Sequence, residues 1–204
     1  MVAIKPPKQI KTPSNLKIAM LYFLNESKTL VEDVKETDTD FPLIYHNGEM
    51  QLKLVSGYGI EDDSVADEEM VMTKIAAAFK KGDDDLKELN SGKQVLAHHL
   101  IQSFSPEEKL TPEQVHEIGL QTMMEFTGGD YEFVIATHVD KHHLHNHIIL
   151  STTNTSTLKK MRWQKNTLKN LRVISDKHAA KYGAKIIEPS MKNSYTKYSA
   201  WRRQ

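Results

Sequence analysis

The sequence predicts an α+β fold in a single domain of 204 residues, with a central antiparallel sheet covered by helices. Two observations predict this class. Short apolar runs separated by turn residues, as at 41–54, indicate hairpins, whereas the capped amphipathic run at 111–128 indicates a helix. Hairpins and helices follow one another without the regular strand and helix alternation of a doubly wound fold, so we expect an antiparallel sheet.

Prolines, caps and turn residues divide the first half of the chain. Ser14 is expected to cap the first helix, and Asn47-Gly48 is a strong two-residue hairpin turn. In order, we expect an extended entry segment with three prolines (1–13), a helix (14–24), an acidic stretch (33–40), a hairpin (41–54) and a second helix (64–82).

The firmest helix signal lies in the second half. Thr111 is a good N-cap, Pro112 suits the first helical position, and Gln114 completes a capping box. In order, we expect a charged loop (81–92), a strand (94–101), this helix (111–128), two strands (131–137 and 144–151), a final helix (168–183) and a short strand (184–187).

Composition narrows the class of protein. The absence of cysteine excludes disulfides, thiolate metal sites and cysteine nucleophiles. No apolar run approaches the roughly 18 residues of a membrane helix, and we expect a soluble, intracellular protein. The net charge is zero, but residues 156–204 carry 13 Lys or Arg against 2 Asp or Glu. Such a tail, with aromatic residues between its charges, suits nucleic acid, although an ordinary solvated helix face followed by a floppy terminus fits equally well.

Histidine supplies five of the ten residues from His138 to His147. His145 and His147 are two apart, so in a strand both rings project from one face. If 131–137 pairs with this strand through a short connection, His138 lies across from them. Three imidazoles then converge, which indicates a metal site with positions open for water or substrate. The alternatives are a solvated histidine-rich turn and core histidines bonded to the backbone.

Four segments of the sequence resemble the relaxase domain of conjugative and mobilisation nickases (MOBP-like), within the HUH endonuclease superfamily. The pattern His-x-Asp-x-x-His-x-His-Asn-His at 138–147 matches the metal motif of that family. Residues 97–104 are similar to its second motif, 19–29 to the segment with the nicking tyrosine, and 171–188 to the stretch after the metal motif. The acidic stretch at 32–63 is the least similar part.

This resemblance implies a mechanism. Tyr22 would attack the scissile phosphate of one DNA strand, forming a 5′-phosphotyrosyl bond that can later be reversed to religate the strand. The three histidines would hold a divalent ion, Mg or Mn by the resemblance. That ion would bind oxygens of the scissile phosphate. Asp140, on the same face as His138 if the strand continues, would orient a ligand ring or accept the phenol's proton, and the alternative is a turn residue with a self-hydrogen bond. Read without the resemblance, Tyr22 is core filler in a helix.

Other side chains are expected around this centre. His98, His99 and His143 are candidates for hydrogen bonds that support the metal ligands, and only one of the adjacent pair His98 and His99 can face the site. Ser103 is a candidate phosphate or sugar contact. Cations and an indole after the metal motif are candidates for gripping DNA: Arg162, Trp163, Lys165, Lys169 and Arg172. Alternatives to Tyr22 are Tyr45, Tyr58 and Tyr131, of which Tyr131 would line the site from the first histidine-bearing strand.

The resemblance also implies the setting. The substrate is expected to be single-stranded or hairpin DNA at an origin of transfer, with accessory DNA-binding and coupling proteins as partners. We expect a bacterial cytoplasmic protein that can enter a recipient cell attached to DNA. Members of the family usually continue further, so the chain is expected to be a relaxase domain, 1–204, excised from a longer protein, with a basic C-terminal segment at about 156–204.

Three competing functions remain open on the sequence. A rolling-circle replication initiator or a single-strand transposase of the same superfamily shares the metal and tyrosine chemistry, although Asn146 is polar where those families usually have an apolar residue. A hydrolytic metalloenzyme would cleave with bound water and leave no adduct. A nucleic-acid-binding module would bind metal without catalysis.

Overall fold

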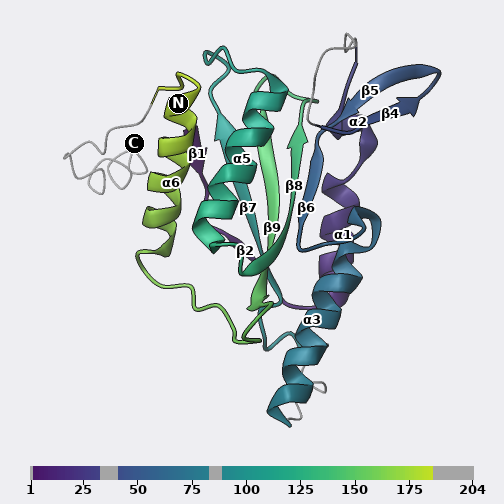
Figure 1. Ribbon diagram of the computed structural model, residues 1–204, viewed down its shortest axis with the longest axis vertical. Helices are drawn as coiled ribbons and strands as arrows, with labels where there is room; N and C mark the ends of the chain where they lie inside the picture. Colours follow the sequence, from purple (N-terminus) through teal and green to yellow (C-terminus); the bar gives the residue numbers. More distant parts are fainter. Residues whose placement is uncertain (1, 33–40, 83–88, 186–204) are drawn as a thin grey trace, which may run out of the picture.

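A computed structural model, which describes residues 2–32, 41–82 and 89–185, has an antiparallel sheet covered by helices, as predicted (Figure 1). Its strands run in the order β1-β7-β9-β8-β6, with β2 also paired to β7, and every pair is antiparallel. The bounds of these strands are β1 Val2–Ile4, β2 Lys8–Ile10, β6 Val55–Tyr58, β7 Ala97–Phe104, β8 Tyr131–His138 and β9 His145–Asn154.

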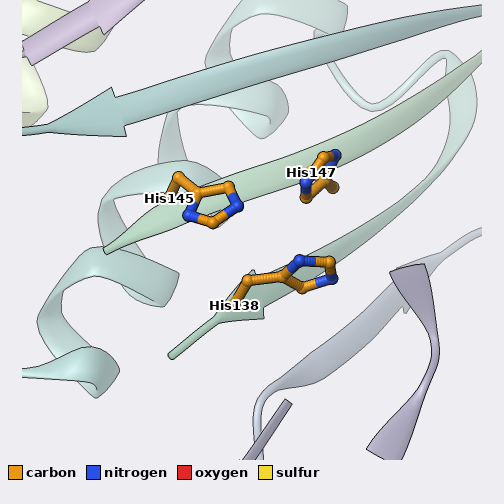
Figure 2. Close-up of side chains that lie close together, drawn as sticks. All are labelled: His138, His145 and His147. Atoms are coloured by element: carbon orange, nitrogen blue, oxygen red, sulfur yellow. The ribbon is translucent and has the colours of Figure 1, made fainter. Parts of the chain in front are cut away.

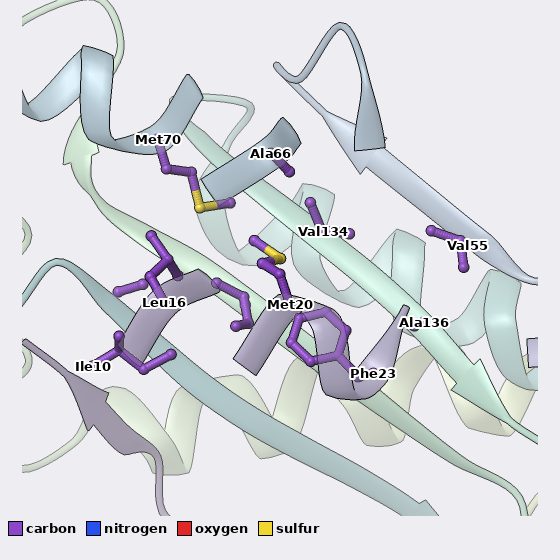
Figure 3. Packing of buried hydrophobic residues seen from close by; sticks show 11 residues of the cluster. Ile10, Leu16, Met20, Phe23, Val55, Ala66, Met70, Val134 and Ala136 are labelled. Atoms are coloured by element: carbon purple, nitrogen blue, oxygen red, sulfur yellow. The ribbon is translucent and has the colours of Figure 1, made fainter. Parts of the chain in front are cut away.

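Helices cover both faces of this sheet. Helices α1 (Pro13–Phe23) and α3 (Ala66–Lys81) pack on one face, in a cluster that contains Leu16, Met20 and Phe23 (Figure 3). On the other face, α5 (Pro112–Thr127) and α6 (Thr167–Lys181) pack over Leu100, Phe133 and Ile148. The sheet is therefore buried on both sides, and alternate residues of each strand enter different cores.

The first residues form an interrupted edge strand. Both β1 and β2 pair with β7, and Pro6 and Pro7 lie between them. Proline has no backbone N–H, so it cannot donate to the sheet and breaks the strand there. Two exposed lysines, Lys5 and Lys8, flank the break.

The helix ends follow from local chemistry. The prediction that Ser14 caps the first helix is wrong: Thr12 is the N-cap, and its hydroxyl accepts from the Asn15 N–H at 3.3 Å. Pro13 then occupies the first turn, where a missing N–H costs nothing. At α5 the predicted capping box of Thr111 and Gln114 is confirmed.

A second, three-stranded sheet has the order β3-β5-β4, with β3 Leu30–Val31, β4 Leu43–His46 and β5 Glu49–Lys53. The hairpin between β4 and β5 is confirmed, since Asn47 and Gly48 adopt φ of 52° and 88°. The short helices α2 (Glu26–Thr29) and η1 (Asp63–Val65) are the remaining elements of the described ranges.

Some predicted elements are displaced or lie elsewhere. The strand expected at 94–101 begins and ends three residues later, because β7 pairs with β1 and β9 as far as Phe104. Ala184 and Lys185 are not in the short strand expected there, and the rest of that strand, the acidic stretch at 33–40 and the end of the basic segment, 186–204, lie outside the described residues. Within the described ranges, no helix is both long and apolar enough to span a membrane.

A buried hydrogen-bond network joins the strands to α5 and α6. Asn146 on β9 accepts from the Thr137 hydroxyl at 2.6 Å and donates to Gln102 Oε1 and to the Val115 carbonyl, both at 2.8 Å. The Gln102 amide donates to Ser175 on α6 at 2.7 Å. The network therefore fixes β7, β8 and β9 against both helices on one face of the sheet.

Gly119 on α5 makes room for this network. A Cβ at this position would collide with the Asn146 amide and with the Ile135 side chain. We predict that Gly119→Ala destabilises the protein by about 1–3 kcal/mol, measured by urea unfolding, because the close packing outweighs alanine's better helix propensity. A more stable Gly119→Ala protein, the result expected from helix propensity alone, would contradict this packing.

Candidate active site

The pairing of β8 with β9 brings three histidines together. His138 lies directly opposite His145, and His147 follows on the same face of β9. The ring centroid of His138 lies 4.3 Å from that of His147 and 5.2 Å from that of His145 (Figure 2). One ring nitrogen from each residue lies within 4.8 Å of the other two. This is the convergence that the sequence predicted.

Each of these rings is held through its other nitrogen. The His138 Nε2–H donates to the Phe23 carbonyl at 3.0 Å, and the His145 Nδ1–H donates to the His143 carbonyl at 3.2 Å. Nδ1 of His147 shares a hydrogen bond of 2.8 Å with Nε2 of His99. These bonds leave Nδ1 of His138 and Nε2 of His145 and His147 for a shared ion, and they fix the ring orientations.

Burial keeps the three rings neutral. Desolvation lowers the pKa of His138 and His145 below the usual histidine range, and desolvation with the neighbouring histidines lowers the pKa of His147 to about 2. A neutral imidazole has the lone pair that a metal requires, so no proton must leave before an ion binds. The donor set therefore fits a divalent metal ion, and imidazole alone accepts several transition metals.

Tyr22 lies beside the histidines, near the end of α1. Its ring centroid is 5.9 Å from that of His147 and 6.1 Å from that of His138, and its side chain is 49% exposed. The Lys28 ammonium lies 3.5 Å from the centre of the Tyr22 ring, in cation–π geometry. An accessible phenol thus adjoins the candidate metal centre.

Phe23 explains why Tyr22 is placed there. The Phe23 ring is fully buried and stacks on His99 and His147, with centroids 6.0 and 6.2 Å apart. Its carbonyl accepts the His138 hydrogen bond, so the end of α1 is fastened to the histidine cluster. Neither Phe23 nor Lys28 was singled out from the sequence, although both lie in the tyrosine segment at 19–29.

The structure distinguishes the two adjacent histidines of β7. His99 faces the triad and bonds to His147, whereas His98 lies on the opposite face, 4.7 Å from the Trp163 ring between centroids. Strand alternation allows only one of the pair on that side, as expected, and the structure assigns that place to His99, so His98 does not support the metal ligands. Ser103 pairs with His145 and lines a cleft together with Tyr22 and His147.

Asp140 does not share the face of His138, contrary to prediction, because β8 ends at His138 and Asp140 is exposed in the following bend. The Phe23 and His143 carbonyls orient the rings instead. The negative charge of Asp140 is still close enough to favour the protonated forms of His138 and His145.

The alternative tyrosines do not approach the triad. Tyr45 lies in the small sheet and is 73% exposed, and the Tyr58 ring stacks on Phe133 in the other core. Tyr131 packs against that same core, so the expectation that it lines the site is wrong. Of these four tyrosines, Tyr22 alone has ring contacts with the triad, to His138 and His147.

The side chains predicted to grip DNA lie after β9 and on α6. Trp163 packs on His98 and Phe126, on the face of the sheet opposite the triad. The Arg172 guanidinium donates to the Ile4 carbonyl at 2.7 Å and so ties α6 to β1. Three further cations are exposed in this region, namely Arg162, Lys165 and Lys169. The structure does not bring any of the five to the histidine cluster.

The chain is similar to a family of relaxase nuclease domains and to a protein named as a relaxase. Residues 43–184 match the family described as "Relaxase: MobA/VirD2-like, nuclease domain", a match that begins after Tyr22. The "Group II intron-interrupted relaxase LtrB" of Lactococcus lactis subsp. cremoris is 44% identical over 93% of this chain. Two proteins named "Protein rlx" from Staphylococcus aureus are 34% and 35% identical over 48% and 50% of it. The chain spans 39% of the length of the Lactococcus protein and 29% and 31% of the length of the two Staphylococcus proteins.

Metal binding to the triad can be measured without any reaction. We predict that Mn²⁺ at about 100 times its Kd adds about 2.7 kcal/mol of stability and raises the Tm by about 5 to 10 °C. His147→Ala should lose this shift, because it removes a central ligand. His142→Ala, at an exposed position in the same connection, should keep it. Equal shifts in both variants would contradict the assignment of the ligands.

Proposed function

Since the chain belongs to the MobA/VirD2-like relaxase family, we propose that it nicks one DNA strand at an origin of transfer with Tyr22 as the nucleophile. The observation that carries this proposal is the exposed Tyr22 ring about 6 Å, between centroids, from two of three converging histidines. The cleft beside them is open to solvent and is lined by Tyr22, His145 and His147.

The Tyr22 phenol oxygen attacks the scissile phosphorus. A bond forms between that oxygen and phosphorus, the bond from phosphorus to the 3′ oxygen breaks, and the phenol's proton is balanced by the proton that the leaving 3′ oxygen gains. The product is a 5′-phosphotyrosyl strand and a free 3′-hydroxyl. His138, His145 and His147 would hold a divalent ion, Mg or Mn in our proposal, which when bound would supply positive charge to the phosphate oxygens.

Lys28 and Phe23 position the nucleophile. The Lys28 ammonium packs on the Tyr22 ring, where its charge also lies near the phosphate that Tyr22 must approach. Phe23 is buried against His99 and His147, so the adjacent Tyr22 cannot move far from the ligands while α1 stays packed. Both contacts restrict the motion of Tyr22 before the reaction, so less conformational entropy is lost when the transition state forms.

The same geometry supports religation. A phosphotyrosyl ester retains the energy of the phosphodiester, so attack by a 3′-hydroxyl reverses the first step and releases Tyr22. A strand that reaches Tyr22 must leave the duplex, so the substrate is single-stranded or an extruded hairpin. We propose accessory DNA-binding and coupling proteins as its partners. We also propose that it acts in the bacterial cytoplasm and can enter a recipient cell attached to DNA.

Two competing functions predict different products. A metal-dependent hydrolase would cleave with water and leave no protein on the DNA. A rolling-circle initiator or transposase would form the adduct but on a different DNA sequence. The relaxase family match favours transfer of a mobile element over both.

The covalent step is tested with a single-stranded oligonucleotide that carries the nick site of the cognate element, plus Mn²⁺. The wild-type protein should form an adduct that survives denaturation. Tyr22→Phe should form none, because it lacks the attacking oxygen but keeps the ring on Lys28 and the metal ligands.

Tyr45→Phe is the matched control, since Tyr45 is an exposed tyrosine on the small sheet. It should form the adduct at the wild-type rate. Retention of the adduct in Tyr22→Phe would exclude Tyr22 as the nucleophile, and cleavage without any adduct would favour the hydrolase.

A further inference from the structure

We infer that the DNA strand reaches Tyr22 through the cleft between β2, β7 and α1, with its phosphates on Lys5, Lys8 and Lys141 and its bases on the apolar side of α1. This inference rests on the proposed function and extends it to the path of the substrate. It locates strand binding on the triad face of the sheet and away from the basic α6 region.

The cleft has a cationic side. It encloses about 650 Å³ next to His145 and His147, and its lining includes Lys5, Lys8 and Lys141. Lys5 and Lys8 flank the proline break of the edge strand, and all three lysines are exposed. Positive charge therefore extends from the sheet edge to the metal ligands.

The opposite side of the cleft is apolar. Ile18 and Ala19 of α1 line it together with Tyr22, and Ile18 is 65% exposed. An isoleucine that exposed costs free energy in water unless something covers it. Apolar surface on one side and lysines on the other match single-stranded nucleic acid, which presents base faces and phosphates at once.

The α6 region offers a poorer path. Trp163, which precedes α6, is partly buried against His98 and Phe126, so it cannot stack on a base without leaving that core. Arg172 is engaged with the Ile4 carbonyl. Strand alternation also puts this region on the side of the sheet away from the triad, so a strand bound there would have to pass around the sheet edge to meet Tyr22.

The test measures binding of fluorescent oligodeoxythymidylate at several salt concentrations. Each lysine that contacts a phosphate of a single strand contributes about 0.7 to the slope of log K against log salt. The double variant Lys5→Gln, Lys8→Gln should therefore reduce the magnitude of the slope by about 1.4. Ile18→Ser should weaken binding by about fivefold and leave the slope unchanged, because it removes apolar contact and no charge.

Matched controls lie elsewhere on the surface. Lys17 is next to Ile18 but pairs with Glu68 at 3.6 Å, and Val173 on α6 is 59% exposed. The variants Lys17→Gln and Val173→Ser should therefore leave both the affinity for the oligonucleotide and the salt slope unchanged. The competing path is probed by the double variant Lys165→Gln, Lys169→Gln. If that variant lowers the slope and the Lys5 and Lys8 variant does not, the inference is overturned.

The same proteins separate this inference from the proposed function. Adduct formation on the nick-site oligonucleotide depends on Tyr22 whichever surface binds the strand. Normal slopes in the Lys5 and Lys8 variant, with an adduct that still requires Tyr22, would reject the path alone. Loss of dependence on Tyr22, with altered slopes, would reject the nucleophile but keep the binding surface.

Discussion

The antiparallel register between β8 and β9 is the constraint on which the rest of the structure depends. It sets His138 opposite His145 and leaves His147 one pleat further along the same face. A slip of one residue would turn the β9 histidines toward the opposite core, because side chains alternate with a period of two. In the observed register Asn146 is hydrogen-bonded to Thr137. The same slip would break this bond and turn Asn146 toward the face of the triad.

The two faces of β9 therefore have different tasks. His145 and His147 converge on one face, and Asn146 between them anchors the strand on the other, in a buried network that reaches α5 and α6. Hydrogen bonds in such a dry environment are costly to leave unmade, so they favour a single register. Precise placement of the metal ligands is thus a property of the whole sheet and of the helices behind it.

Local signals in the sequence predicted much of this arrangement. The capping box at Thr111, the Asn47-Gly48 turn and the alternating histidines each act over a few residues, and each appears where it was expected. Features set by distant contacts were not predictable. The choice between His98 and His99 depends on the register of β7 with β9, and the end of β8 at His138 removed Asp140 from the predicted face. Phe23 reaches the histidines only because α1 packs on them. Lys5, Lys8 and Lys141 line one cleft only in the folded protein. Nothing local in the sequence indicates either feature.

The central claim, three imidazoles that share one cation beside Tyr22, is tested most directly by anomalous diffraction from crystals loaded with Mn²⁺. The hydrogen bonds to Phe23, His143 and His99 determine which nitrogens remain for the ion. The account predicts one anomalous peak about 2.0–2.3 Å from Nδ1 of His138 and from Nε2 of His145 and His147. A peak bonded to other side chains, or bound through Nε2 of His138, would contradict it.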